Sequence, residues 1–134
     1  MEKLIQEAKI AYMRTYSPYS KFGVGAALLL KDGTIIHGTN IEISSFGLTN
    51  CAERSALFSA YSQGYRKEDI EKIAIIGNTE KPISPCGACR QVMSELMDLD
   101  CEVILANLSG DKMTLKVRDL LPYHFSSEDM KYGK

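Results

Sequence analysis

Cysteines at the predicted starts of two helices place the strongest constraint on how this chain folds. Residues 51–63 and 87–97 carry apolar side chains at helical spacing, and Cys51 and Cys86 stand at or directly before these starts. Cys89 follows Cys86 by one helical turn, so the two lie on one side of the helix. Unsatisfied amide groups and the helix dipole favour thiolates at a helix N-terminus. Bringing both helix starts together would present three thiolates to one metal ion.

The other apolar segments predict strands and helices in an α/β order. Asp32-Gly33 is a strong hairpin signal between the first two strands. Residues 107–111 join the last two strands and are too few for a parallel crossover, so these strands are expected to be antiparallel. We therefore predict an α/β fold with a single mixed five-stranded sheet covered by helices. The predicted strands are residues 23–30, 34–39, 73–76, 102–106 and 113–117, and the remaining helical segments are residues 3–14 and 118–121.

Composition indicates one soluble domain spanning residues 1–134, since 45% of the chain is hydrophobic and 25% is charged. Lys and Arg total 16 against 17 Asp and Glu, which argues against a nucleic-acid partner. The longest apolar run, residues 24–30, is far shorter than the roughly 20 residues that span a membrane. The N-terminus lacks a hydrophobic signal core. We therefore expect a cytoplasmic protein without membrane or nucleic-acid partners, whose cysteines are reduced.

Three chemistries are open to the cysteine cluster. A Cys-x-x-Cys pair alone fits a dithiol redox centre as well as a metal site. A structural zinc needs a fourth ligand, and the candidates Cys101, His37 and His124 stand outside any ligand-spaced motif. Cys101 is better explained as a small buried hydrophobic residue. Three cysteines with an open fourth position describe a catalytic zinc, whose bound water has a pKa lowered to about 7.

Glu53 is a candidate proton carrier beside the cysteines. An acid in the first turn of a helix also suits the helix dipole, which is the ordinary explanation for such a residue. At the mouth of a helix, however, residues two apart can serve one site that lies beyond the end of the axis. Beside the three cysteines, we interpret Glu53 as a general acid/base. Arg54 follows directly, either as a hydrogen-bond donor to a cysteine sulfur or as an ordinary surface charge.

These motifs together resemble the zinc-dependent cytidine deaminases. The resemblance is carried by Cys51-Ala52-Glu53-Arg54 and by Pro85-Cys86-Gly87-Ala88-Cys89-Arg90-Gln91. It extends over nearly the whole chain, through residues 16–22, residues 24–27, Asn40-Ile41-Glu42, Leu120-Leu121-Pro122 and Phe125. The chain most resembles the small homotetrameric enzymes that act on free nucleosides and use three cysteines. The resemblance implies a three-layer α/β/α fold with active sites shared between subunits.

The resemblance also implies a role for each site residue. Cys51, Cys86 and Cys89 would bind one Zn²⁺ per subunit. Glu53 would move protons from the attacking water to N3 and to the departing amine. Cytidine and 2′-deoxycytidine would become uridine and 2′-deoxyuridine with release of ammonia, as in pyrimidine salvage. The substrate would be contacted by Phe22 on the pyrimidine, Asn40 and Glu42 on the ribose hydroxyls, the backbone of Ala52 on the base, the Ser84 carbonyl near the leaving amine and Phe125 from a neighbouring subunit.

Each of these substrate contacts also has an ordinary structural explanation when taken alone. Phe22 fits a core position, Asn40 a turn and Glu42 a solvated charge. Phe125 fits an anchor for the C-terminal tail. Asn40 and Glu42 are two apart, so they share a face on an extended strand and could bind one sugar. Arg90 fits either a helix-surface charge or a partner of the site.

Two positions depart from the family pattern, and three other functions compete. Ile43 and Phe46 stand where the family usually has Asn and Tyr, which removes an amide and a hydroxyl from a loop near the expected subunit interface.

Deaminases of blasticidin-type antibiotics share the zinc motifs but lack Asn-x-Glu, so Asn40 and Glu42 favour a nucleoside. A nucleic-acid-editing deaminase is disfavoured by the near-neutral charge and by the short last connection. A non-enzymatic zinc or dithiol protein would turn over no cytosine compound.

Overall fold

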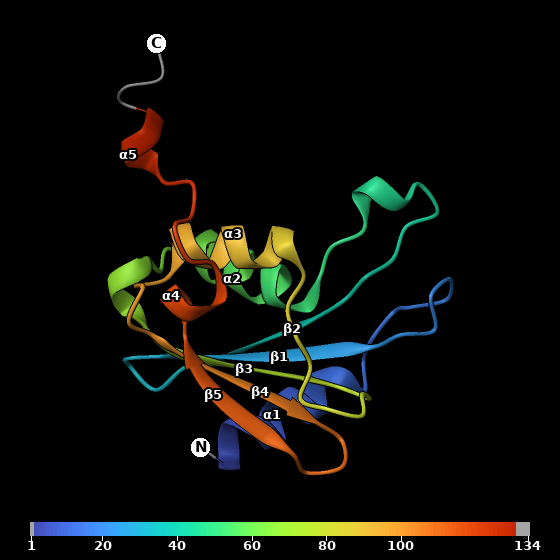
Figure 1. The fold of residues 1–134 in the computed structure, drawn as a ribbon. Coiled ribbons are helices and arrows are strands. Elements are labelled where there is room, and N and C mark those ends of the chain that lie inside the picture. Colours follow the sequence, from blue (N-terminus) through green and yellow to red (C-terminus); the bar gives the residue numbers. More distant parts are fainter. Residues whose placement is uncertain (1, 131–134) are drawn as a thin grey trace.

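One mixed sheet forms the centre of the described part of the molecule (Figure 1). The computed structural model describes residues 2–130, so residues 1 and 131–134 of the predicted domain lie outside the described residues. Neighbouring strands follow the order β2-β1-β3-β4-β5, which confirms the predicted five-stranded sheet. The strands are β1 (Val24–Leu30), β2 (Ile35–Thr39), β3 (Ile70–Gly77), β4 (Glu102–Asn107) and β5 (Lys112–Lys116).

The strand directions follow from the lengths of the connections. β1 pairs antiparallel with both β2 and β3. β3 and β4 are parallel, because the chain between them includes helix α3 (Gly87–Leu96) and is long enough for a crossover. The short connection from β4 to β5 is closed by Asp111, whose N–H donates to Oδ1 of Asn107 at 2.9 Å. These two strands are antiparallel, as predicted.

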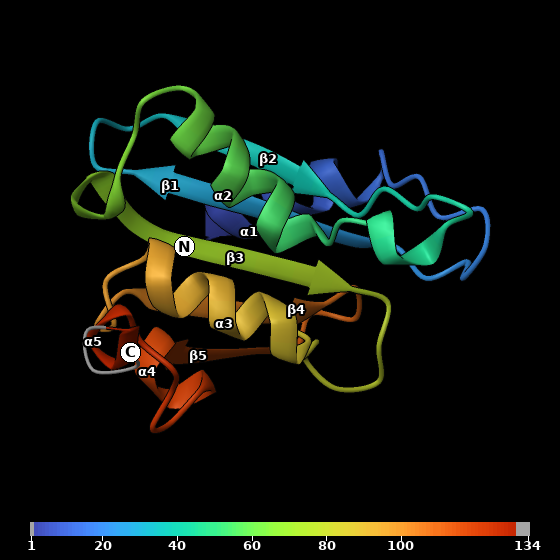
Figure 2. The same ribbon diagram turned by 90° about the horizontal axis from the view of Figure 1, so that it is seen from above.

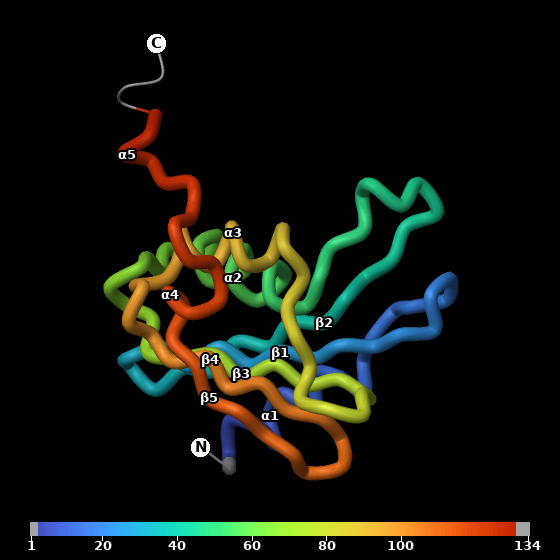
Figure 3. Tube along the Cα trace, viewed as in Figure 1, coloured from blue at the N-terminus to red at the C-terminus, as the bar shows by residue number. Residues whose placement is uncertain are grey.

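Helices cover both faces of the sheet and complete three layers. α1 (Glu2–Tyr12) lies on one face, whereas α2 (Ala52–Ser62) and α3 lie on the other (Figure 2). After β5 the chain rises past the layer of α2 and α3 (Figure 3). No helix within residues 2–130 has the length and apolar character needed to cross a bilayer. The short elements are η1 (Phe46–Leu48), η2 (Lys67–Asp69), α4 (Val117–Leu120) and α5 (Ser127–Met130).

The apolar core is divided between the two faces of the sheet. β1 shows the division directly, because Leu28 faces α2 and α3 while its neighbour Ala27 faces α1. Cys101 lies in the core under α2 and α3, as predicted. The core under α2 and α3 is the bulkier one and includes Leu57, Ile75, Met93 and Val103, while the α1 core includes Leu4, Ala8, Ala74 and Ile104.

Two glycines let helices lie directly on the strand backbone. A Cβ at Gly38 in β2 would stand 2.2 Å from the carbonyl oxygen of Ala52, the first residue of α2. A Cβ at Gly25 in β1 would stand 2.3 Å from the carbonyl oxygen of Ala8 in α1. Real side chains do not tolerate such distances, so both contacts require glycine. Gly38 therefore fixes how closely the first turn of α2 approaches the sheet.

The observed elements differ from the predicted ones mainly at their ends. β3 begins at Ile70 rather than residue 73, because Glu71 and Lys72 interrupt the apolar run, although Lys72 still pairs with Leu29 and Ile70 pairs with Leu30 across a register shift. The closing helical turn is found at Val117–Leu120, one residue earlier than predicted. The sequence analysis missed η1, η2 and α5, none of which contains a buried residue.

Candidate active site

The starts of α2 and α3 meet at one end of the sheet, toward which β3 runs (Figure 2). Cys51 Sγ lies 3.9 Å from Cys86 Sγ, and Cys86 Sγ lies 3.3 Å from Cys89 Sγ. All three sulfur atoms lie within 4.8 Å of one another. The structure therefore brings together the three cysteines that the sequence analysis grouped.

Backbone geometry explains why the sulfurs gather there. Cys51 and Cys86 are the N-cap residues of α2 and α3 and have extended backbones, with ψ of 159° and 165°. Their carbonyls accept the first helical bonds, from Ser55 N at 2.9 Å and from Arg90 N at 3.0 Å. The amide groups of each first turn therefore point toward the cluster, where they favour negative charge.

The donor set fits zinc. Tetrahedral zinc with Zn–S bonds of about 2.3 Å separates its sulfur ligands by about 3.8 Å. The two sulfur–sulfur distances of 3.9 Å and 3.3 Å lie near that value and far above a disulfide bond. Within residues 2–130, Cys51, Cys86 and Cys89 form the group of potential metal ligands, so a fourth coordination position would be left for water or substrate.

Arg54 reaches back from α2 to the cluster. Its Nη2 donates to Cys51 Sγ at 3.2 Å, while its buried Nε finds no acceptor among the described residues. Hydrogen bonds from Cys89 and Arg54 lower the pKa of Cys51 to about 5, which favours the thiolate form of this sulfur. The hydrogen bond to Cys51, together with burial, raises the pKa of Cys89. Of the two interpretations of Arg54, the geometry supports the donor to a cysteine sulfur.

Glu53 lies inside the protein beside the cysteines. The residue is 4% exposed, and burial raises the pKa of its carboxyl group. The same residue lines a cavity of about 280 Å³ that also reaches Cys51 and Cys86. A buried carboxyl group that faces a cavity at a potential metal centre is suited to proton transfer.

The cavity also gathers most of the residues expected to bind substrate. Phe22, Asn40, Glu42, Ala52 and Ser84 all line it. Phe22 is 44% exposed, which is inconsistent with the alternative of a core position. Phe125 does not line this cavity and is 56% exposed, which leaves it available to another surface.

Asn40 and Glu42 have a second task, which is to hold the loop before β1. Asn40 Nδ2 donates to the Phe22 carbonyl at 2.8 Å, and its Oδ1 accepts from Val24 N at 2.9 Å. Glu42 accepts from Ser20 N at 2.9 Å and from the Ser20 hydroxyl. These bonds lower the pKa of Glu42, so its carboxylate stays ionised. Both side chains are buried, which is inconsistent with a solvated charge at Glu42.

Several lining residues were missed by the sequence analysis. Ser20 had a visible signal, because it belongs to the motif of residues 16–22. Phe46 was noted as a departure near an interface, whereas the structure places it in the wall of the cavity. The other missed lining residues, Val24, Thr49 and Ile83, have ordinary strand or loop patterns.

Comparison with known proteins agrees with this geometry. The chain is 56% identical over 129 residues to a cytidine deaminase of Halalkalibacterium halodurans, covering 96% of each protein. It is 53% identical to a cytidine deaminase of Sporosarcina psychrophila, covering 99% of this chain and 96% of the relative. The crystal structure of cytidine deaminase from Burkholderia pseudomallei superposes with a TM-score of 0.91 at 52% identity, covering 92% of this chain and 98% of that one.

The fold and the cysteine cluster beside a buried acid define a zinc-dependent hydrolytic deaminase with one Zn²⁺ per chain. Residues 1–105 match the family described as "Cytidine and deoxycytidylate deaminase zinc-binding region", and the chain belongs to this family.

Proposed function

We propose that the protein hydrolyses cytidine and 2′-deoxycytidine to uridine and 2′-deoxyuridine, with release of ammonia. The observation that carries this proposal is that one cavity contains Glu53, two of the clustered cysteines and the Asn40–Glu42 pair. A nucleoside has a reactive base and a polar sugar. The cavity offers Glu53 and the cysteines to the base, and Asn40 and Glu42 to the sugar. The role is consistent with pyrimidine salvage, and we place the enzyme in the cytoplasm.

Cys51, Cys86 and Cys89 are the proposed zinc ligands. Their sulfur spacing, the facing helix starts and the hydrogen bond from Arg54 to Cys51 support this assignment. Zinc, when bound, lowers the pKa of a water molecule to about 7 and so makes hydroxide available at neutral pH.

Glu53 is the proposed general acid/base. It takes the proton of the attacking water and passes it to N3 of the cytosine ring, which neutralises the nitrogen as oxygen adds to C4. It then takes the proton of the new hydroxyl group at C4 and gives it to the amine, so that the C4–O double bond forms as the C4–N bond breaks and ammonia leaves. Its burial at the cavity wall supports this role, because water competes poorly for the transferred proton there.

The remaining lining residues orient the nucleoside. Asn40 and Glu42 bind the ribose hydroxyls with the hydrogen-bonding capacity left after they hold the loop before β1. Phe22 packs on the pyrimidine at the mouth of the cavity. The backbone of Ala52 contacts the base, and the carbonyl of Ser84 receives the leaving amine.

A homotetramer with shared sites is the proposed assembly. Phe125 is largely exposed and does not line the cavity of its own chain, which supports a contact with the site of a neighbouring subunit. We further propose that residues 1–134 form one catalytic domain.

Metal analysis combined with a turnover assay tests the function. The purified protein is expected to contain one zinc per chain and to release ammonia from cytidine and 2′-deoxycytidine, with little release from free cytosine. Free cytosine leaves Asn40 and Glu42 without their sugar partners, which such sites reject strongly. Chelator-treated protein is the control. Bound zinc without turnover of any cytosine compound would identify a non-enzymatic metal protein, and turnover confined to a blasticidin-type compound would identify an antibiotic deaminase.

A further inference from the structure

We propose that Arg90 is a positioning residue that ties the loop carrying Ser84 to the C-terminal segment carrying Phe125. This inference deepens the proposed function and rests on it, since Ser84 and Phe125 are substrate contacts there. One guanidinium group would then align two parts of the active site that are far apart in the chain.

The guanidinium group of Arg90 makes three hydrogen bonds to two separate segments. Its Nε donates to the carbonyl of Pro85 at 2.8 Å, and its Nη2 donates to the hydroxyl of Ser84. Its Nη1 donates to the carbonyl of Leu120 at 2.7 Å. Each nitrogen therefore has its own acceptor, and the group bridges residues 84–85 to the end of α4.

Electrostatics argues against an incidental surface charge. Arg90 lies in the first turn of α3, where the positive end of the helix dipole disfavours a cation. The position is favourable because all three bonds are charge-assisted and two of the acceptors are backbone carbonyls. A lysine could not replace this arrangement, because one ammonium group cannot match the fixed fork of a guanidinium.

Gln91 extends the same attachment toward Phe125. Its Nε2 donates to the carbonyl of Phe125 at 2.8 Å, so residues 90 and 91 hold the two ends of the segment from Leu120 to Phe125. Between these ends, Tyr123 is fully exposed and has a left-handed backbone with φ of 52°. Leu120 itself is buried in the core, whereas Pro122, Tyr123 and Phe125 beyond it are exposed. After Leu120, the path of the segment therefore depends on its attachment to α3.

The other end of the bridge reaches the cavity wall. Ser84 lines the cavity beside Cys86, and Arg90 holds both its hydroxyl and the next carbonyl along the chain. The Ser84–Pro85 peptide is therefore fixed from outside the cavity. A shift of this peptide would displace the carbonyl that receives the leaving amine, while the three sulfur atoms would keep their places at the helix starts.

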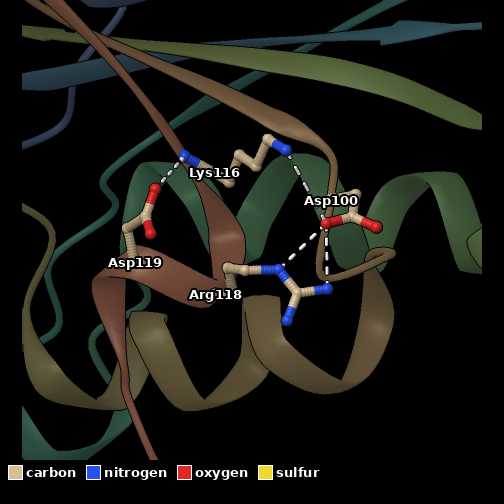
Figure 4. A network of polar contacts seen from close by, with 4 residues as sticks. All are labelled: Asp100, Lys116, Arg118 and Asp119. Carbon is tan, nitrogen blue, oxygen red and sulfur yellow. Dashed lines mark hydrogen bonds and ion pairs between the residues drawn. The ribbon is translucent and has the colours of Figure 1, made fainter.

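The test compares three variants with one matched control in the zinc-loaded protein. Arg90→Gln removes the bridge, Arg90→Lys keeps the charge with a single donor group, and Gln91→Leu removes the attachment of Phe125. The control is Arg118→Gln, because Arg118 is an exposed arginine that donates to Asp100 on the surface (Figure 4). For each variant we would measure kcat and KM for cytidine, zinc content, and amide hydrogen exchange of residues 121–126.

Arg90→Gln is expected to lower kcat/KM by about 10- to 100-fold with zinc retained, because a small misplacement of a reacting group has an effect of that order. Exchange at residues 121–126 should become faster. Arg90→Lys should fall between wild type and Arg90→Gln, and Arg118→Gln should match wild type. Combining Arg90→Gln with Phe125→Leu should cost less than the product of the single effects, because both changes disable the same contact.

Wild-type kinetics and wild-type exchange in Arg90→Gln would overturn the inference. A loss of activity that only tracks a loss of zinc in Arg90→Lys and Gln91→Leu would also overturn it. If Arg90→Gln does not fold, these two milder variants decide the question, since wild-type kcat/KM in both contradicts a positioning role. A wild-type enzyme that fails to deaminate cytidine would instead contradict the proposed function, whereas active wild type with unaffected variants contradicts this inference alone.

Discussion

The two helix starts that form the site are built differently. At the start of α2, Ala52 and Glu53 are buried and the first turn lies against the backbone of β2 at Gly38. At the start of α3, Gly87 and Ala88 are exposed, and a long loop leads into the helix. Close packing thus holds the start of α2 in place, while polar contacts such as those of Arg90 hold the start of α3.

The two helix starts therefore suit different roles in the proposed mechanism. The α2 start contains Glu53, the proposed general acid/base, and dense packing suits a group that must keep one position. In the proposed mechanism the loop before α3 contributes the carbonyl of Ser84 near the leaving amine, and the hydrogen bonds of Arg90 hold this loop. Changes on the α2 side should therefore affect chemistry and stability, and changes on the α3 side should affect alignment.

Glu53→Gln should have the largest effect. The amide keeps the size of the buried side chain but cannot transfer protons, so turnover of cytidine should fall by at least about 10² to 10⁴-fold. Zinc content should stay at the wild-type level. The control is Glu68→Gln in η2, which should keep full activity. Near wild-type turnover in zinc-loaded Glu53→Gln would remove Glu53 from the mechanism.

Arg54→Gln should have the next largest effect. Loss of the hydrogen bond from Arg54 to Cys51 leaves more negative charge at the metal centre. Groups that support metal ligands in this way typically contribute about 10- to 100-fold to activity or metal affinity. We expect a loss of that order in turnover or in zinc affinity, measured by competition with a chelator. Equal values in Arg54→Gln and in Arg118→Gln would assign no such role to Arg54.

A pair of glycine substitutions compares the two helix starts directly. Gly38→Ala places a methyl group against the Ala52 carbonyl, so the free energy of unfolding should fall by about 1–3 kcal/mol and turnover should decrease. A Cβ at Gly87 meets no atom within 4 Å, so Gly87→Ala should be neutral or stabilising, by up to about 1 kcal/mol. Denaturant unfolding at fixed zinc measures both. Similar losses in the two variants would contradict the difference in packing.

Glu42→Gln should have the smallest effect on stability, and one that depends on pH. Hydrogen bonds from Ser20 and from Tyr19 N lower the pKa of Glu42 from its ordinary value of 4.5. The ionised carboxylate therefore stabilises the folded state above pH 4.5, and this contribution disappears as pH falls through the lowered pKa. The thermal midpoint of Glu42→Gln should lie below wild type at pH 7, and the gap should narrow in acid. A gap that widens in acid would reverse the assigned direction.

Residue spacing and connection length predicted the features of this molecule that depend on short stretches of the chain. The spacing of Cys86 and Cys89 predicted that they share one side of a helix, because helix geometry sets where such residues project. Cys51 was joined to them as a cysteine at a second helix start, and the structure brings all three together. The short last connection predicted the antiparallel pairing of β4 and β5, because chain length limits the topology.

The features that were missed depend on contacts between distant segments. Arg90 reaches Leu120, and Asn40 holds Phe22, and neither pairing leaves a periodic signal in the sequence. Phe46 lies in the loop between β2 and α2 and lines the cavity beside residues distant in the chain. α5 was missed because it buries no side chain, so no hydrophobic pattern marks it.

The meeting of two helix starts has a consequence for how the folded chain is maintained. Cys51 and Cys86 belong to separate elements, so the unfolded chain does not hold their sulfurs in place for one ion. Zinc binding and folding are therefore linked equilibria, and free zinc at one hundred times its dissociation constant would add about 2.7 kcal/mol to stability. A chelator would therefore lower the stability of this enzyme as well as its activity.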